Sequence, residues 1–103
     1  PDNPAIAESL LFLGTLEYSQ RNLTTSETLL TRAAEIAARA PGKSRVTLAE
    51  IQFCLAVLYD TKRDKTRALD MAQKSYDIRR NELGSSDPKT KDAQTLLNRL
   101  KGR

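Results

Sequence analysis

The chain has 103 residues and a formal net charge of +4; 39% of its residues are hydrophobic, 5% are aromatic, and tryptophan is absent. This length suits one domain with an aliphatic, alanine-rich core. No apolar run approaches the roughly 20 residues of a membrane-spanning helix, and no signal peptide is visible. The single cysteine, Cys54, excludes an internal disulfide and fits a reducing compartment, so we expect an intracellular, cytoplasmic protein without membrane contact.

The apolar residues predict helices along the whole chain. In the first segment, Ile6, Leu10, Leu13 and Leu16 recur at three- and four-residue steps, which is the spacing of one helix face. Glycine and proline gather at a few boundaries instead of scattering, and no segment carries the signal of a strand. The expected helices span about 4–20, 24–40, 45–62, 65–83 and 88–101.

Capping residues stand at the outer helix boundaries. Asn3 precedes Pro4, and Asp87 precedes Pro88, so in each case a capping side chain comes before a proline at the first helical position. Gly84 suits the position that follows the fourth helix.

The inner turns carry similar signals. Asn22 can cap the second helix, and Thr24 with Glu27 has the spacing of a capping box. Pro41-Gly42 is expected to stop this helix, and Asp64 takes the place of Asn22 before the fourth helix.

Two stretches of the chain match at a shift of 42 residues, which indicates an internal repeat. The identical pairs are Ala7/Ala49, Glu8/Glu50, Leu13/Leu55, Leu16/Leu58, Arg21/Arg63, Thr24/Thr66 and Ile36/Ile78. Small residues also keep register, and they predict close approach of the paired helices at Gly14/Ala56, Ser26/Ala68 and Ala33/Ser75. We expect the remaining core to be filled by Leu13, Leu16, Leu30, Ile36 and their counterparts.

The predicted fold is all-α, with antiparallel helical hairpins stacked as a right-handed α-solenoid. A single domain covers 1–103, with one repeat at about 4–40, a second at about 45–83, and a half repeat or capping helix at about 88–101. The last helix would shield the second hairpin with Ala93, Leu96, Leu97 and Leu100. Because the chain starts at Pro1 and not at methionine, we expect it to be a fragment of a longer array.

This pattern resembles the tetratricopeptide repeat, in the 42-residue form found in kinesin light chains. The first unit reads Leu10-x2-Leu13-Gly14 and then Ser26-x3-Leu30-x2-Ala33. The second unit reads Gln52-x2-Leu55-Ala56-x2-Tyr59 and then Ala68-x3-Ala72-x2-Ser75. The connection IRRNELGSSDPKT is similar to the family's linker between repeats. The resemblance covers about 6–101 and implies a scaffold or adaptor that binds other proteins.

The sequence offers no catalytic constellation. There is no histidine, so the commonest acid–base group and metal ligand is missing. Cys54 has no histidine to activate it and no second cysteine with which to bind zinc. No glycine-rich loop resembles a phosphate cradle. We therefore expect no enzyme activity, no metal and no cofactor.

The resemblance implies a concave binding face formed by the first helix of each repeat. The positions carried over to this face are Leu11, Phe12, Thr15, Tyr18, Ser19, Phe53, Cys54, Val57, Asp60, Thr61, Thr95 and Arg99, with Glu8, Glu50, Asp92 and Leu96 beside them. Such a face suits a peptide or an amphipathic helix with basic flanks. In the alternative interpretation, Leu11, Phe12 and Phe53 pack within the array or against a neighbouring repeat.

Two other classes of function stay open. Residues 41–103 carry fourteen Lys and Arg against eight Asp and Glu, which gives a basic half. Nucleic acid is the weaker alternative partner, bound with steep salt dependence through Lys62, Arg63, Lys65, Arg67, Arg79 and Arg80. The chain could also be an architectural segment, and two copies could pair as a homodimer through the ends of the array.

Overall fold

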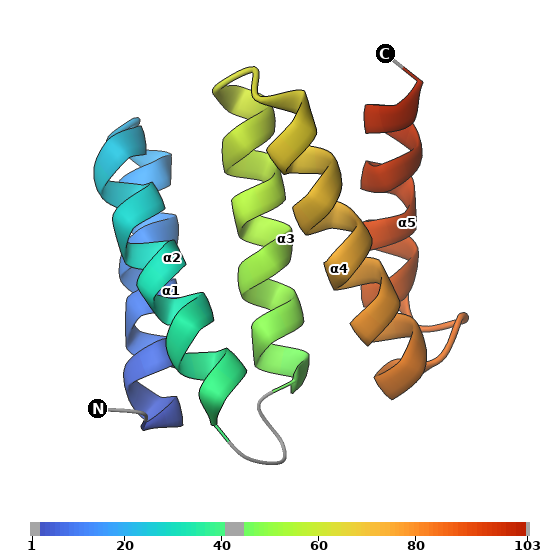
Figure 1. Cartoon of the computed structure of the whole chain (residues 1–103), viewed down its shortest axis with the longest axis horizontal. Helices are drawn as coiled ribbons and strands as arrows, with labels where there is room; N and C mark the ends of the chain where they lie inside the picture. Colours follow the sequence, from blue (N-terminus) through green and yellow to red (C-terminus); the bar gives the residue numbers. More distant parts are fainter. Residues whose placement is uncertain (1–2, 41–44, 103) are drawn as a thin grey trace.

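The described chain forms two antiparallel pairs of helices, followed by a fifth helix. The computed structural model describes residues 3–40 and 45–102. The helices are α1 (Pro4–Ser19), α2 (Leu23–Arg39), α3 (Arg45–Thr61), α4 (Lys65–Leu83) and α5 (Pro88–Lys101), and no strand occurs in the described part of the chain (Figure 1). The predicted helix bounds are confirmed to within one residue, while the stop predicted at Pro41-Gly42 lies outside the described residues.

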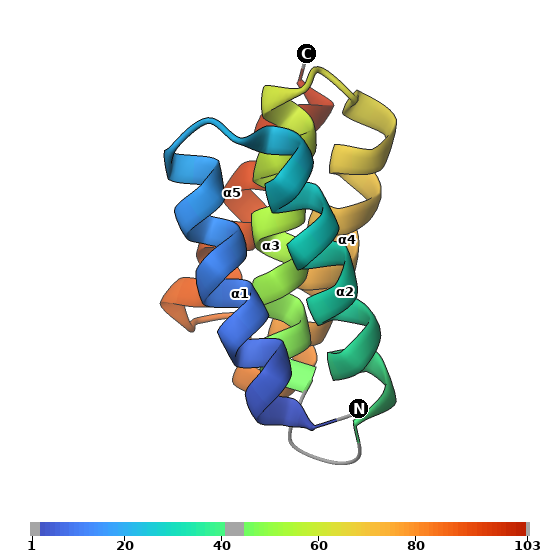
Figure 2. The same ribbon diagram turned by 90° about the vertical axis from the view of Figure 1, so that its left-hand side faces the viewer.

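The helices stack in a zigzag. α1 packs on α2 and α3 packs on α4 to form two hairpins, and α2 contacts α3 while α4 contacts α5. Seen from the α1 end, α1 and α5 project on one side of α3, and α2 and α4 lie on the other side (Figure 2). Each second helix therefore lies between two first helices, which is the arrangement of an α-helical solenoid.

Small residues bring the two helices of each hairpin together, as the sequence predicted. Gly14, Ala56, Ser26, Ala68, Ala33 and Ser75 are all buried. A Cβ atom added to Gly14 would lie 2.7 Å from Cγ of Leu30 on the facing helix. At this point the Ser26 hydroxyl donates a 2.7 Å hydrogen bond to the Gly14 carbonyl. Ser75 bonds the Ala49 carbonyl in the second hairpin at the same distance.

Three of the predicted caps are confirmed. The side chains of Asn3, Asp64 and Asp87 accept hydrogen bonds from backbone N–H groups in the first turns of α1, α4 and α5. Asn22 stands at the N-cap of α2, but its side chain makes no cap bond and donates to the Glu17 carboxylate instead.

The capping box predicted from Thr24 and Glu27 is wrong. Thr24 is already inside α2, and its carbonyl accepts a bond from the Thr28 hydroxyl. The Glu27 carboxylate turns away from its own helix end toward α3 and α4, where cationic and hydroxyl donors offer stronger bonds than a backbone amide.

Arg21 and Arg63 occupy equivalent turns with left-handed backbones, at φ values of 68° and 64°. The Arg21 N–H bonds the Tyr18 carbonyl, and the Asn22 N–H bonds the Glu17 carbonyl. These two bonds form a Schellman motif, and the same pair of bonds recurs around Arg63. The motif favours glycine, because a side chain at positive φ is strained.

We therefore expect Arg63→Gly and Arg21→Gly to stabilise the fold. The left-handed conformation costs a residue with a side chain about 1–2 kcal/mol, and glycine removes this strain. Glycine also makes the unfolded chain more flexible, which offsets part of the gain. A net stabilisation of about 0.5–1 kcal/mol is therefore expected at each position. Urea unfolding measures the change. Arg32→Gly, on the exposed surface of α2, is the matched control and should lose about 1 kcal/mol. A loss of that size in Arg63→Gly would contradict the strain assigned to the turn.

One part of the predicted core is wrong. Leu55 and Leu58 of α3 are 4% and 0% exposed, as expected. Their equivalents Leu13 and Leu16 are 44% and 42% exposed. The reason is position, since α2 covers the outer side of α3 and no described helix covers the outer side of α1.

The fifth helix packs against the second hairpin. Ala93, Leu96, Leu97 and Leu100 are all buried against the second hairpin, which confirms their predicted shielding role.

Candidate functional site

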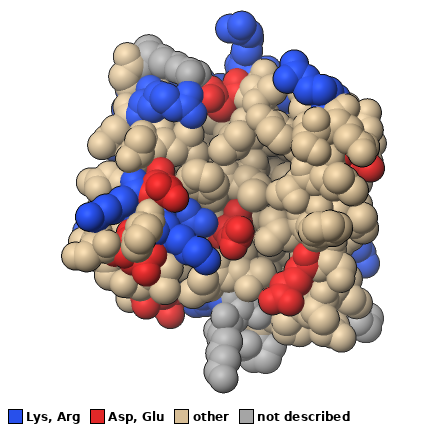
Figure 3. Space-filling view, turned by 180° about the vertical axis from the view of Figure 1, so that it is seen from behind, with Lys and Arg blue, Asp and Glu red and all other residues tan. Residues whose placement is uncertain are grey.

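The first helices of the array form one face of the molecule, which we call the groove face (α1, α3 and α5). Figure 3 looks onto this face from behind the view of Figure 1. The half that α1 forms is largely free of charged side chains, while charged side chains of both signs gather on the half that α5 forms. The groove face therefore has an apolar half and a charged half.

A cavity of about 180 Å³ opens between α1, α2 and α3, and we call it the apolar pocket. Its lining consists of Thr15, Tyr18, Leu30, Phe53, Cys54 and Val57. All of these except Leu30 belong to the residues predicted for the binding face. A cavity on the order of 150 Å³ with such a lining holds a ligand the size of benzene. The apolar pocket therefore has room for one leucine- or phenylalanine-sized side chain.

Two hydrogen bonds, one within α3 and one between α1 and α3, fix the rim of the apolar pocket. The Thr61 hydroxyl donates to the Val57 carbonyl at 3.0 Å, so the 2.7 Å contact between Tyr18 and Thr61 has the phenol as donor. This bond joins the last turns of α1 and α3. Because both hydroxyl groups are engaged, the rim next to Val57 presents carbon to an incoming side chain.

The Cys54 thiol is a wall of the pocket and not a nucleophile. Burial raises its pKa to about 11, and Glu50 adds to the rise while Arg79 partly opposes it. At neutral pH the thiol is therefore protonated, and a protonated thiol behaves as a small apolar group.

A second hollow continues the groove on the far side of α3. It is lined by Phe53, Val57, Asp92, Thr95, Leu96 and Arg99. Phe53 and Val57 border both hollows, so the two form one groove across α3. The Arg99 guanidinium pairs with the Asp60 carboxylate at 3.2 Å and ties α5 to α3.

The remaining predicted site residues lie toward the edges of the groove face. Asp60 and Thr61 line a shallow hollow with Arg63 and Lys65 at the last turn of α3. Leu11 packs against the core and borders neither groove hollow.

Two other predicted residues of α1 line neither hollow of the groove. Phe12 is 68% exposed and lines neither hollow of the groove. The Ser19 hydroxyl bonds the Leu16 carbonyl of its own helix.

The buried side chain of Arg79 packs against Phe53, a residue that lines the groove. The sequence did not predict this role. Its guanidinium carbon lies 4.8 Å from the centre of the Phe53 ring, and its Nη1 donates to the Lys89 carbonyl at 3.0 Å. The residue is only 4% exposed. The equivalent position in the first hairpin is Ala37, so the repeat itself gave no signal for a cation here.

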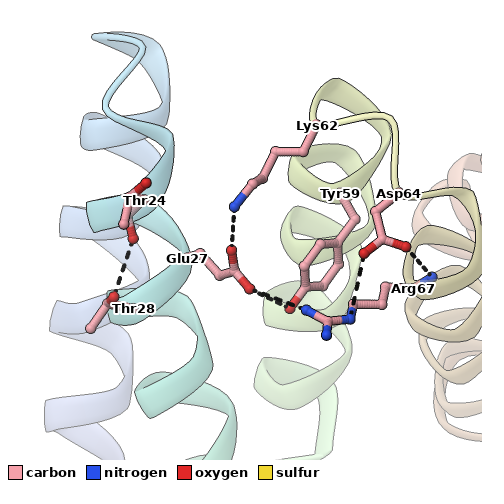
Figure 4. A network of polar contacts seen from close by, with 7 residues as sticks. All are labelled: Thr24, Glu27, Thr28, Tyr59, Lys62, Asp64 and Arg67. Carbon is pink, nitrogen blue, oxygen red and sulfur yellow. Dashed lines mark hydrogen bonds and ion pairs between the residues drawn. The ribbon is translucent and has the colours of Figure 1, made fainter.

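Other basic residues proposed for nucleic-acid contact are engaged within the protein. Lys62 bonds the Glu27 carboxylate at 2.6 Å, and Arg67 contacts both Glu27 and Asp64 (Figure 4). Arg80 lies over the ring of Tyr76, at 5.8 Å from its centre. With Arg79 buried, these side chains do not form an unpaired basic surface.

Stacked helical hairpins with a groove along their first helices define the class of this protein, an α-helical repeat array. Residues 5–81 match the family model described as tetratricopeptide repeat. The chain therefore belongs to the tetratricopeptide repeat family, whose members generally serve as scaffolds for protein–protein interaction. A comparison of the sequence with curated proteins gives no match.

Two further observations concern metal binding and membrane crossing. Among residues 3–40 and 45–102, no group of three or more His, Cys, Asp and Glu side chains is placed to hold a metal ion. None of the described helices combines the length and the apolar character needed to cross a membrane.

Proposed function

We propose that this chain is a non-catalytic protein–protein interaction module that binds a peptide or an amphipathic helix along the groove face. The apolar pocket carries this proposal, because it is a cavity of side-chain size with a carbon-rich lining on the face that the first helices form. One large apolar side chain of the partner, of the size of leucine or phenylalanine, anchors there.

The charges beside the pocket determine which residues are favoured next to the apolar anchor of this peptide. Burial lowers the pKa of Arg79, and the neighbouring carboxylates Glu50, Asp92 and Asp87 act against that change. Glu50 and Asp92 lie in the first halves of α3 and α5 and are both exposed. A lysine or arginine next to the apolar anchor would therefore meet two carboxylates at this end of the groove.

The proposal excludes covalent catalysis at the only cysteine. Cys54 is protonated at neutral pH, and the sequence holds no histidine to activate it. Among residues 3–40 and 45–102, no contact favours the nucleic-acid alternative over the groove.

A displayed library of random peptides tests the proposal. Peptides selected on the wild-type protein should share one large apolar residue with a neighbouring lysine or arginine. Thr15→Trp places a bulky ring at the mouth of the apolar pocket, and it should weaken these peptides about 10- to 100-fold, because burial of one such side chain contributes about 1.5–3 kcal/mol. Fluorescence titration of the selected peptides measures the affinities.

Thr28→Trp is the matched control. Thr28 is also an exposed threonine whose hydroxyl bonds a carbonyl of the preceding turn, but it lies on α2, outside the groove face. This variant should bind the selected peptides as tightly as the wild type. Selected peptides that bind equally well to Thr15→Trp would show that the pocket is not the anchor site.

A further inference from the structure

The outer face of α1 is an apolar surface outside the groove. We define it by Ile6, Ser9, Phe12, Leu13 and Leu16, which recur at three- and four-residue steps along one side of the helix. The four large side chains are 40%, 68%, 44% and 42% exposed, and they are the large exposed hydrophobic residues of the described chain. No acidic or basic residue interrupts the stripe between Ile6 and Leu16.

The internal repeat shows that the outer face of α1 has the same kind of residues as a surface that is buried in the second hairpin. Leu13 and Leu16 correspond to Leu55 and Leu58, and these leucines of α3 are buried by α2. The same residues on the same side of the equivalent helix thus have a packing partner in one hairpin, and in the other hairpin they have none among the described residues.

The opposite end of the array lacks such a surface. The α5 residues Lys91, Gln94 and Asn98 stand where Ala7, Leu10 and Gly14 stand in α1, and all three are polar and exposed. Of the two ends of the array that the structure describes, the α1 end is therefore the one with an apolar surface. A contact that uses one end of each molecule closes at two copies and does not propagate into a fibre.

The charges at this end do not match a stacked helix of the kind that covers α3. At the junction of the hairpins, Glu27 of α2 meets Lys62 and Tyr59. The equivalents of these two residues at the α1 end are Gln20 and Glu17. An acidic side chain from a helix stacked like α2 would meet a carboxylate there and no cation.

We propose that the outer face of α1 binds the same face of a second copy, with the two helices antiparallel about a twofold axis. Residues equally far from the axis then pair, so that Ile6 lies opposite the partner's Leu16 and Ser9 lies opposite the partner's Leu13. The small Ser9 allows close approach along a helix about 24 Å long.

The antiparallel arrangement also gives Glu17 a favourable position. Its carboxylate reaches the N-terminal turn of the partner helix, where the macrodipole is positive. The first turn of α1 carries no acidic residue of its own. The contact is thus complementary in charge as well as apolar, and it does not involve the groove face.

Sedimentation velocity and light scattering on the purified chain test this inference. From about 1 µM to about 200 µM, the wild type should pass from the mass of one chain to the mass of two. Ser9→Arg adds a charge at the centre of the face and removes no apolar contact, and it should weaken dimerisation at least about 10-fold. Leu13→Asp should do the same, with circular dichroism as the test of folding in both variants.

Gln94→Arg on the polar side of α5 is the matched control, and it should dimerise like the wild type. The pairing is overturned if the wild type stays one chain throughout the range, which would leave the face to a helix from a different source. Dimerisation of Ser9→Arg with wild-type affinity would also overturn it. Thr15→Trp lies outside the contact and should still dimerise, so failure of the groove proposal and failure of this one are separable.

Discussion

Leu58→Ala is expected to lower the free energy of unfolding by about 2–5 kcal/mol, while Leu16→Ala is expected to lower it by less than about 1 kcal/mol. The two leucines hold the same place in the repeat, but Leu58 is 0% exposed and Leu16 is 42% exposed. Truncation of Leu58 leaves a cavity between α3 and α2, whereas truncation of Leu16 removes carbon that water already contacts. Urea unfolding of both variants and the wild type measures the difference.

Protein concentration is the control in this comparison. At low micromolar concentration, where the chain is a monomer, Leu16→Ala should be nearly neutral. At higher concentration its loss should grow, because the wild type gains stability from pairing of its α1 helices and the variant gains less. A loss of several kcal/mol from Leu16→Ala in the monomer would mean that the outer face of α1 is covered within a single chain, and would contradict the structure.

The sequence predicted the helices well because several boundaries have a local cause. Asn3 and Asp87 stand before prolines, and their caps form as expected. The register of small residues predicted the close approach at Gly14, because only sterics matter there. The exposure of Leu13 and Leu16 could not be predicted in this way, since a repeat pattern describes a face and does not say whether a neighbour covers it.

The candidate site likewise contains residues that could be predicted from the sequence and residues that could not. The pocket residues on α1 and α3 are positions that the resemblance to the family implies, and they include Thr15 and Tyr18 on α1 and Phe53 and Val57 on α3. Leu30 and Arg79 come from second helices, and only the packing of the hairpins brings them to the groove. The sequence placed Arg79 among the basic residues of the nucleic-acid alternative, because its burial depends on the Phe53 ring and the start of α5.

Glu27 gives the second large expected effect, because its carboxylate links the two hairpins. It accepts from Lys62 at 2.6 Å and from the Tyr59 hydroxyl at 3.0 Å, and Arg67 lies 3.8 Å away (Figure 4). The hydrogen bond from Lys62 is the main cause of the lowered pKa of Glu27, partly opposed by burial. Burial and then the bond to Glu27 raise the pKa of Tyr59. The ionised carboxylate is therefore the form that the junction stabilises.

We expect Glu27→Gln to lower the free energy of unfolding by about 1–2 kcal/mol at pH 7, because two charge-assisted bonds weaken at a partly exposed site. The pKa of Glu27 is lower in the folded chain than in the unfolded chain, where it is about 4.3. The contribution of the carboxylate is therefore complete above the unfolded pKa, and it is lost as the pH falls through the folded pKa. Urea unfolding at a series of pH values should show the wild type and Glu27→Gln converging in acid.

Glu35→Gln is the matched control for this prediction. Glu35 is an exposed carboxylate on the same helix, and its replacement should change stability by less than about 0.5 kcal/mol at pH 7. A difference between wild type and Glu27→Gln that stayed constant into acid would show that the link between the hairpins depends on the shape of the side chain and not on its charge. Convergence would instead identify the Glu27 carboxylate as an electrostatic link between the two hairpins.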